Sequence, residues 1–207
     1  MEKIDLASWP RREAFEHFSR VSWPFYSVTF DVDVTQVSRY TKEKGISFYY
    51  TMTWLVTRAV EQVEALMLDI RDGEVWRLDH RLPSFTDLKP GAEQFHIVTL
   101  PMEADPVTFE RAARAASEAQ TAFIDMSKEG RDLLFISSLP WVRLTGLTNE
   151  RTPDPEDCVP RIAWGRWTEQ GGRKILGLSV EVNHRTVDGL HIGRFAQALE
   201  REIEALP

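Results

Sequence analysis

The chain has 207 residues, 43% of them hydrophobic, which is enough to bury a substantial core and predicts one domain over residues 1–207. Its 32 acidic residues outnumber its 25 basic ones, and a net charge of −7 without a basic patch disfavours a nucleic-acid partner. No run of about 18 apolar residues predicts a membrane span, no apolar signal core lies near residue 1, and the lone Cys158 cannot form an internal disulfide, so we expect a cytoplasmic protein.

The first half of the chain mixes helical and strand patterns. Residues 26–34 alternate apolar and polar side chains, which predicts a strand with one solvated face. Residues 48–63 are apolar nearly all round at first, which predicts a buried helix. Asp72-Gly73 between two apolar runs is the short-range signal for a β-hairpin. The elements expected here are a short helix after Trp9-Pro10, the strand 26–34, a helix 35–44 capped by Thr35 and ended by Gly45, the helix 48–63, and hairpin strands 68–70 and 75–78.

The second half ends in an alternating strand followed by a helix. Leu178, Val180 and Val182 occupy one parity of this strand, and from Gly189 the apolar residues recur at helical spacing. The other elements expected are strands 83–88 and 95–100, a helix 105–123 capped by Asp105, a strand 133–138, a loop 145–160, and strands 162–167 and 174–182 around Gly171-Gly172. This order predicts an α+β fold, with a mixed or antiparallel β-sheet and helices packed on one face.

A candidate catalytic segment links the last predicted strand to the last helix. It reads H-x-x-x-D-G, from His184 to Gly189. His184 shares the parity of the apolar strand residues, so its imidazole is expected to point into the protein. A histidine at a strand end, followed by an acid and a glycine, is the arrangement expected where a general base is held rigidly at a cleft.

Simpler roles are open to the same residues. His184 could be a hydrogen-bonded core residue, because histidine is intermediate in its burial preference. Asp188 stands at an expected helix N-cap and could serve only to accept bonds from first-turn N–H groups. His184, Asp188 and His191 could also be metal ligands, since two imidazoles and a carboxylate suit zinc or iron, although no second His/Cys cluster completes the shell.

Three motifs, in order along the chain, resemble those of the chloramphenicol acetyltransferase family. The segment N-H-R-T-V-D-G-L-H-I-G-R-F at 183–195 is similar to the family's signature, in which a His-His pair is followed by three residues, Asp-Gly, an aromatic residue and a His. W-x-R-R-E-x-F at 9–15 resembles the family's W-x-R-K/R-E-H-F, and I-S-S-L-P-W-V at 136–142 resembles I-S-A-L-P-W-V. The first segment is also close to the D-H-R-x-x-D-G of dihydrolipoyl acyltransferase cores, from the same superfamily of CoA-dependent acyltransferases, but the other two motifs favour the first family.

The resemblance implies a two-layer α+β sandwich and an O-acetyltransferase with acetyl-CoA as co-substrate and no bound cofactor or metal. It implies that His184 is the general base toward a hydroxyl of chloramphenicol or a related acceptor, and that Ser137 donates to the oxyanion of the intermediate. It further implies a structural salt bridge between Asp188 and Arg11, and a homotrimer with active sites at subunit interfaces. The other residues that it assigns are His17, Phe18, Phe95 and Phe135 for the acceptor, and Tyr49 and Trp167 for acetyl-CoA.

The chain departs from the family pattern mainly on the acceptor side. The leading histidine of the His-His pair is Asn183, a threonine that helps to order water near the intermediate is Ala163, and a polar residue before the serine motif is Phe135. These changes predict an altered acceptor pocket, because a methylene-sized change shifts selectivity by about 1–3 kcal/mol. Asn183 and Ala163 also leave open a second function, that of a non-catalytic trimeric small-molecule-binding protein of the same fold.

Overall fold

The computed structural model describes residues 1–207 and has the predicted α+β architecture. None of its helices combines the length and the apolar character that a membrane span requires. The helices are α1 (Arg12–Phe18), α2 (Thr35–Lys44), α3 (Phe48–Glu61), α4 (Pro106–Ala119) and α5 (Gly189–Glu204), with 3-10 turns η1 (Glu64–Met67) and η2 (Met126–Lys128). The strands are β1 (Glu2–Lys3), β2 (Phe25–Asp33), β3 (Leu68–Arg71), β4 (Glu74–Arg77), β5 (Leu82–Asp87), β6 (His96–Thr99), β7 (Leu133–Leu139), β8 (Arg161–Gly165), β9 (Thr168–Gln170) and β10 (Arg173–Asn183).

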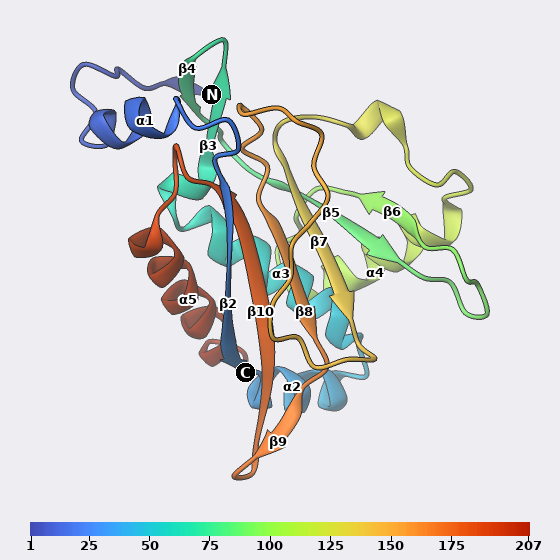
Figure 1. Cartoon of the computed structure of the whole chain (residues 1–207). Helices are drawn as coiled ribbons and strands as arrows, with labels where there is room; N and C mark the ends of the chain where they lie inside the picture. The colour runs from blue at the N-terminus through green and yellow to red at the C-terminus, as the bar shows by residue number, and fades with distance from the viewer.

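The strands form a large mixed sheet and a small antiparallel one. The large sheet has the order β2-β10-β8-β7-β5-β6, with β9 added beside β10. In it β7 runs parallel to both β5 and β8, whereas the other pairs are antiparallel. The small sheet has the order β1-β4-β3. Figure 1 shows α3 and α4 behind the large sheet, α5 alongside β2 at the left of the view, and α1 beside the small sheet at one end of the molecule.

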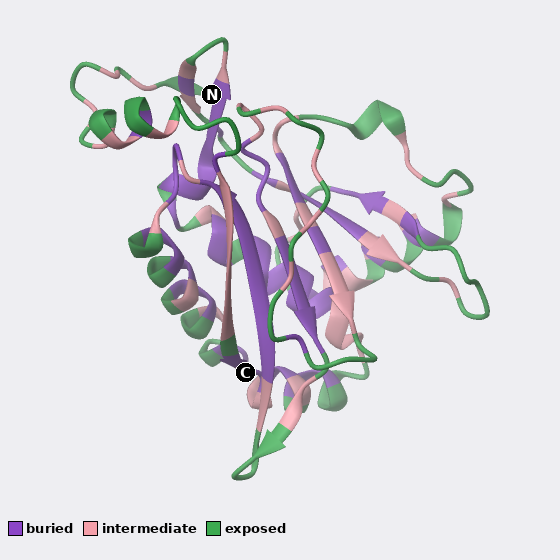
Figure 2. Cartoon of the chain, in the orientation of Figure 1, coloured by how far each residue is buried: buried purple, intermediate pink, exposed green.

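The core lies between the large sheet and its helices. Leu176, Leu178, Val180 and Val182 of β10 belong to the main buried cluster, together with residues of α3, α4 and α5 such as Phe195. Figure 2 shows the buried residues concentrated in the central strands and on the helix sides that face them. The predicted alternation of β10 is therefore confirmed, and it assigns one side of the sheet to the helices.

The opposite side, which we call the outer face, is covered in part by the long loop 143–160. A Cβ at Gly177 or at Gly165 would collide with the backbone of Leu144, so both positions require glycine for the loop to lie this close to β10 and β8. Farther along, the Glu181 carboxylate accepts hydrogen bonds from the backbone of Asn149 (2.8 Å) and from Arg151 (2.7 Å), whose side chain is fully buried. The loop is thus tied to the sheet.

Several expected boundaries hold and others do not. The Asp72-Gly73 hairpin is confirmed, with φ values of 53° and 77°. The helix expected to reach residue 123 ends at Ala119, because the backbone at Gln120 turns extended and its side-chain amide donates to the Ile97 carbonyl, 2.6 Å away. Residues 162–167 do not form one strand, because the Arg166 N–H leaves the ladder to bond the Val142 carbonyl at 2.7 Å. Thr35 is the first residue of α2 and not its cap, which is Val34.

Candidate active site

His184 follows β10 directly and stands before the turn into α5. Its backbone N–H donates to the Pro24 carbonyl at 2.6 Å. Its Nδ1 lies 2.9 Å from the Val187 carbonyl oxygen, which can only accept, so Nδ1 carries the ring proton. Nε2 makes no hydrogen bond within the chain and keeps its lone pair, and the residue is half-buried rather than sealed in the core. The geometry therefore gives the ring the tautomer that a general base needs at Nε2.

Two aromatic rings pack against the His184 imidazole. Phe18, at the end of α1, stacks on it with ring centroids 3.9 Å apart and planes 19° apart. Tyr26 of β2 lies 4.5 Å away on a tilted plane. Burial raises the pKa of Tyr26 to about 12, with a further increase from the charge of Asp188, so this phenol stays neutral beside the imidazole. His17 is exposed and meets Phe18 edge-on at 5.0 Å, without contacting His184 through a ring pair.

An ion pair between Arg11 and Asp188 lies at the N-terminus of α5, four residues after His184. Asp188 is the N-cap of α5 and accepts from the Leu190 N–H at 3.0 Å, while its other oxygen pairs with the Arg11 guanidinium. Burial opposes ionisation of Asp188, but the hydrogen bond and charge of Arg11 and the bond from the Leu190 N–H outweigh it, and the pKa of Asp188 falls below its usual value. The contact joins the segment before α1 to the corner that carries His184.

Replacing Arg11 by alanine is expected to lower the free energy of unfolding by about 1–2 kcal/mol, a value reduced because Asp188 is 35% exposed. Since the pKa of Asp188 is lowered in the folded state, this stabilisation is present at neutral pH and is lost as the pH falls through the folded-state value. Urea unfolding of both proteins over a descending pH series measures it. Arg12→Ala is the matched control, because Arg12 pairs only with exposed Glu16 on its own helix. Equal losses for the two variants would contradict a special role for Arg11.

Ser137 lies in the middle of β7 and points to the outer face. Its strand neighbours Leu134 and Ile136 belong to the core cluster, whereas Phe135 and Ser137 are half-buried on the other side. The hydroxyls of Ser137 and Thr86 are 3.0 Å apart, and the Tyr49 hydroxyl donates to the Thr86 carbonyl at 2.7 Å. The hydroxyl of Thr86 on β5, whose backbone is in turn bonded by Tyr49 of α3, thus fixes the position of the Ser137 side chain.

Within one chain, Ser137 and His184 do not meet. Ser137 pairs in register with Ala163 of β8, which pairs with Ser179 of β10. His184 is five residues beyond Ser179 and one past the end of β10, so His184 and Ser137 differ by about 16 Å along the strand direction and about 10 Å across it, or about 19 Å in all. They also face opposite sides, because His184 sits beside Tyr26, which packs against the helix-side core. A single copy cannot bring both side chains to one reacting carbonyl.

The remaining predicted site residues lie apart from His184. Phe95 is 43% exposed near β6 and packs on Phe123 at 5.3 Å. Phe135 lies under the Arg161 guanidinium at 5.2 Å. Trp167 contacts Phe48 at 4.9 Å and the Lys174 ammonium at 5.1 Å, near the start of α3. Tyr49 lies close to Ser137 through Thr86, so of the predicted acetyl-CoA contacts only this one falls at a predicted catalytic side chain.

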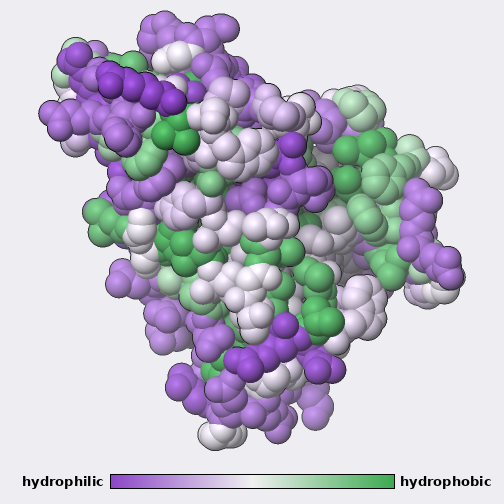
Figure 3. All heavy atoms as spheres, viewed as in Figure 1, coloured by the Kyte–Doolittle hydropathy of each residue, from purple (hydrophilic) through white to green (hydrophobic).

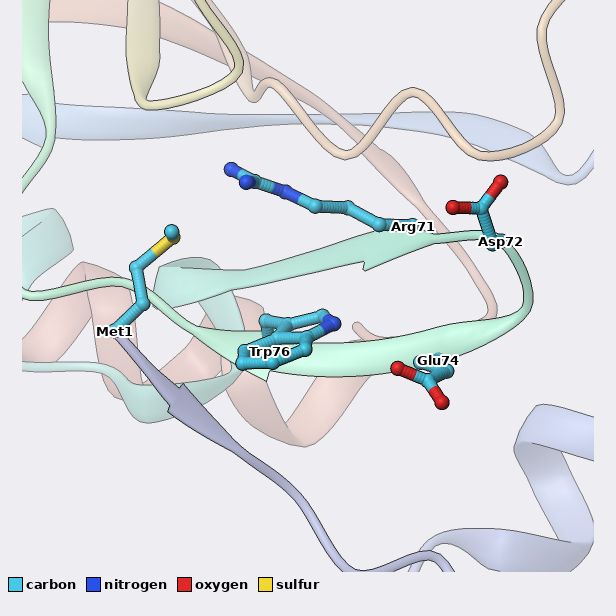
Figure 4. A pocket seen from close by; sticks show the side chains of 5 residues that line it. All are labelled: Met1, Arg71, Asp72, Glu74 and Trp76. Carbon is cyan, nitrogen blue, oxygen red and sulfur yellow. The ribbon is translucent and has the colours of Figure 1, made fainter.

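The other reactive groups do not assemble a second centre at His184. Asp188 pairs with Arg11, and no group of three or more His, Cys, Asp or Glu side chains is arranged to hold a metal ion, so the His184, Asp188 and His191 metal shell has no geometric support. Burial raises the pKa of the Cys158 thiol to about 12, in keeping with an incidental thiol. Figure 4 shows a shallow surface pocket between the N-terminus and the β3–β4 hairpin, lined by Met1, Arg71, Asp72, Glu74 and Trp76, none of them a predicted site residue.

Two side chains that lie next to predicted catalytic residues, one at His184 and one at Ser137, were not predicted. The sequence pattern assigns Tyr26 only to an alternating strand, and its place beside His184 follows from the register in which it pairs with Val182. Thr86 lies in an expected strand, but nothing in the sequence links it to Ser137. Both are ordinary strand residues, and only the strand order brings them to the site.

The sequence is similar to known chloramphenicol acetyltransferases over nearly its whole length. A profile of the chloramphenicol acetyltransferase family matches residues 1–200. The chain is 31% identical over 203 residues to a chloramphenicol acetyltransferase of Streptomyces acrimycini, covering 95% of this chain and 91% of that protein. It is 28% identical over 201 residues to chloramphenicol acetyltransferase 3 of Escherichia coli, covering 96% and 94%.

Solved structures show the same fold. A chloramphenicol acetyltransferase superposes with a TM-score of 0.86 at 22% identity, covering 97% of this chain and 99% of that one. The cubic core of the pyruvate dehydrogenase multienzyme complex superposes with a TM-score of 0.69 at 16% identity, covering 93% and 86%. These likenesses concern the arrangement of the sheet and helices.

Proposed function

The chain belongs to the chloramphenicol acetyltransferase family, and from this premise we propose that it moves an acetyl group from acetyl-CoA to a hydroxyl of a small molecule, chloramphenicol or a related acceptor. Membership makes it a CoA-dependent acetyltransferase. The observation that carries the assignment of the base is the bond from His184 Nδ1 to the Val187 carbonyl, which leaves Nε2 free in a half-buried aromatic slot. No metal or bound organic cofactor is part of the proposed reaction.

In the proposed reaction Nε2 of His184 takes the proton of the acceptor hydroxyl while its oxygen attacks the thioester carbonyl. The C–O bond forms, and the negative charge passes to the former carbonyl oxygen, to which a serine hydroxyl donates. When the intermediate collapses, the C–S bond breaks and the His184 proton goes to the departing CoA sulfur. The histidine is neutral again at the end of the cycle, and the acetyl ester and free CoA are the products.

The serine in this scheme is Ser137 of a second copy. The separation of about 19 Å and the opposite faces of His184 and Ser137 in one chain support a site shared between subunits. Figure 3, which views the outer face, shows apolar patches over the middle of the sheet and beside β5 and β6, a surface suited to subunit contact. We propose a homotrimer with active sites at its interfaces, in which His184 of one subunit faces Ser137 of the next.

The residues that depart from the family pattern differ in how they bear on acceptor selectivity. The Asn183 amide donates to the Pro155 carbonyl at 2.8 Å, and its oxygen accepts from the Arg185 N–H at 3.0 Å. Asn183 is therefore buried and ties the long loop to β10, and its side chain lies on the opposite side of the strand from that of His184. Ala163 is buried between Ser137 and Ser179, so a water-ordering hydroxyl is missing beside the proposed oxyanion donor. We propose that acceptor selectivity differs here mainly at Ala163 and Phe135.

Release of free CoA thiol from acetyl-CoA, measured with a panel of acceptors that includes chloramphenicol, tests the proposed function. Buried Cys158 adds little to the thiol signal. We expect acceptor-dependent release that a chelator leaves unchanged. Acetyl-CoA or acceptor binding with no release for any acceptor favours the non-catalytic binding protein, and sensitivity to the chelator favours a metal-dependent reaction.

A further inference from the structure

Two histidines hydrogen-bond to opposite ends of one peptide group at the start of α5. His184 Nδ1 lies 2.9 Å from the Val187 carbonyl oxygen. The N–H of Asp188 lies 3.0 Å from Nδ1 of His191. The Val187 carbonyl and the Asp188 N–H belong to the same planar peptide, so the two rings are connected through it.

The chemistry of the groups gives these bonds a direction. A carbonyl only accepts, so His184 carries its proton on Nδ1, and a backbone N–H only donates, so Nδ1 of His191 presents a lone pair. The two histidines therefore hold opposite neutral tautomers, protonated at Nδ1 in His184 and at Nε2 in His191. Hydrogen bonds in series polarise one another, so an acceptor on the peptide N–H makes the peptide oxygen a stronger acceptor for His184.

We propose that His191 is a positioning residue for the reaction, which holds the Val187–Asp188 peptide so that His184 keeps its orientation and its free Nε2. This inference rests on the proposed function, in which His184 is the base. His191 touches neither the acceptor nor acetyl-CoA in this scheme, because it is buried under the corner. In sequence terms it occupies N3 of a capping box, where Gln or Glu is usual.

The surroundings of His191 favour its neutral form. Burial lowers the pKa of His191, the charge of Asp188 raises it, and the charges of Arg11 and Arg194 lower it, with a net decrease. Its Nδ1 is also 3.0 Å from an Asp188 oxygen, but the Asp188 N–H that points at Nδ1 can only donate, so Nδ1 is the acceptor of that bond. The ring is thus available as an acceptor for the Asp188 N–H at neutral pH.

Two substitutions separate positioning from general stability. His191→Gln keeps a side-chain acceptor at the usual capping-box position, whereas His191→Leu removes the acceptor and keeps apolar bulk. We expect His191→Leu to lower kcat about tenfold with the KM for acetyl-CoA nearly unchanged. The separate variant His191→Gln is expected to keep kcat within about twofold of the wild-type value.

Nitrogen NMR of protein labelled with ¹⁵N-histidine, together with ¹⁵N-Asp, tests the geometry without substrate. We expect His184 to be protonated at Nδ1 and His191 at Nε2, a scalar coupling across the Asp188 N–H···Nδ1 bond, and a mixed His184 tautomer in His191→Leu. A His184 ring protonated at Nε2 in wild type, no coupling at Asp188, or an unchanged tautomer in His191→Leu overturns the inference, whatever happens to kcat. If His191→Leu does not fold, the wild-type tautomers and the coupling decide alone, and if wild type shows no turnover the proposed function fails while this test remains valid.

Discussion

Replacing His184 by alanine is expected to lower kcat for acceptor-dependent CoA release by about a hundred- to ten-thousandfold. Of the two histidines at the turn from β10 into α5, His184 keeps Nε2 free in the half-buried slot, whereas its Nδ1 is occupied by the Val187 carbonyl and Nδ1 of His191 by the Asp188 N–H. Steady-state rates of thiol release at saturating acetyl-CoA and acceptor measure the loss. The KM for acetyl-CoA is expected to change little, because the substitution leaves the sheet and α5 unaltered.

A matched control separates loss of the base from loss of any histidine. His80 is exposed, with 57% of its side chain accessible, and its nearest charged partner is Asp132. His80→Ala is expected to keep the wild-type rate. Turnover by His184→Ala within about threefold of wild type would remove His184 from the role of base, and the reaction would then need another proton acceptor.

Replacing Ser137 by alanine is expected to lower kcat by about a hundred- to a thousandfold, because one hydrogen-bond donor to the oxyanion is lost. The hydroxyl is held by Thr86 on the outer face, and the substitution leaves the core side of β7 untouched. Ser138→Ala is the matched control, since Ser138 is the next residue of the same strand, also half-buried, and points to the other side. If both variants lose activity equally, the effect belongs to β7 packing and not to an oxyanion donor.

The local signals in the sequence predicted the elements around the site. Alternation in residues 175–182 identified β10, and Asp188 before an apolar helical repeat identified the start of α5 and its N-cap. Asp72-Gly73 and Asp105-Pro106 likewise act through their own backbone preferences, so the hairpin and the start of α4 were correct. These features depend on residues only a few positions apart.

What the sequence left unpredicted depends on contacts between distant segments. The end of α4 is decided by the bond from Gln120 to Ile97, and the break after β8 by the bond from Arg166 to Val142. Tyr26 reaches His184 because β2 pairs with β10, and Thr86 reaches Ser137 because β5 pairs with β7. No periodicity encodes strand order, so the separation of His184 from Ser137 could be found only in three dimensions.

In the proposed trimer one active site takes its base from one subunit and its oxyanion donor from another, and mixing two inactive variants tests this sharing. His184→Ala and Ser137→Ala chains are co-refolded in equal amounts, so that each mixed trimer contains one interface with an intact His184 facing an intact Ser137. For random mixing in a closed three-subunit ring, we expect recovery of about a quarter of the wild-type activity. If each variant alone is inactive and the mixed oligomers, separated by distinct affinity tags, remain as inactive as their parents, the shared site is contradicted.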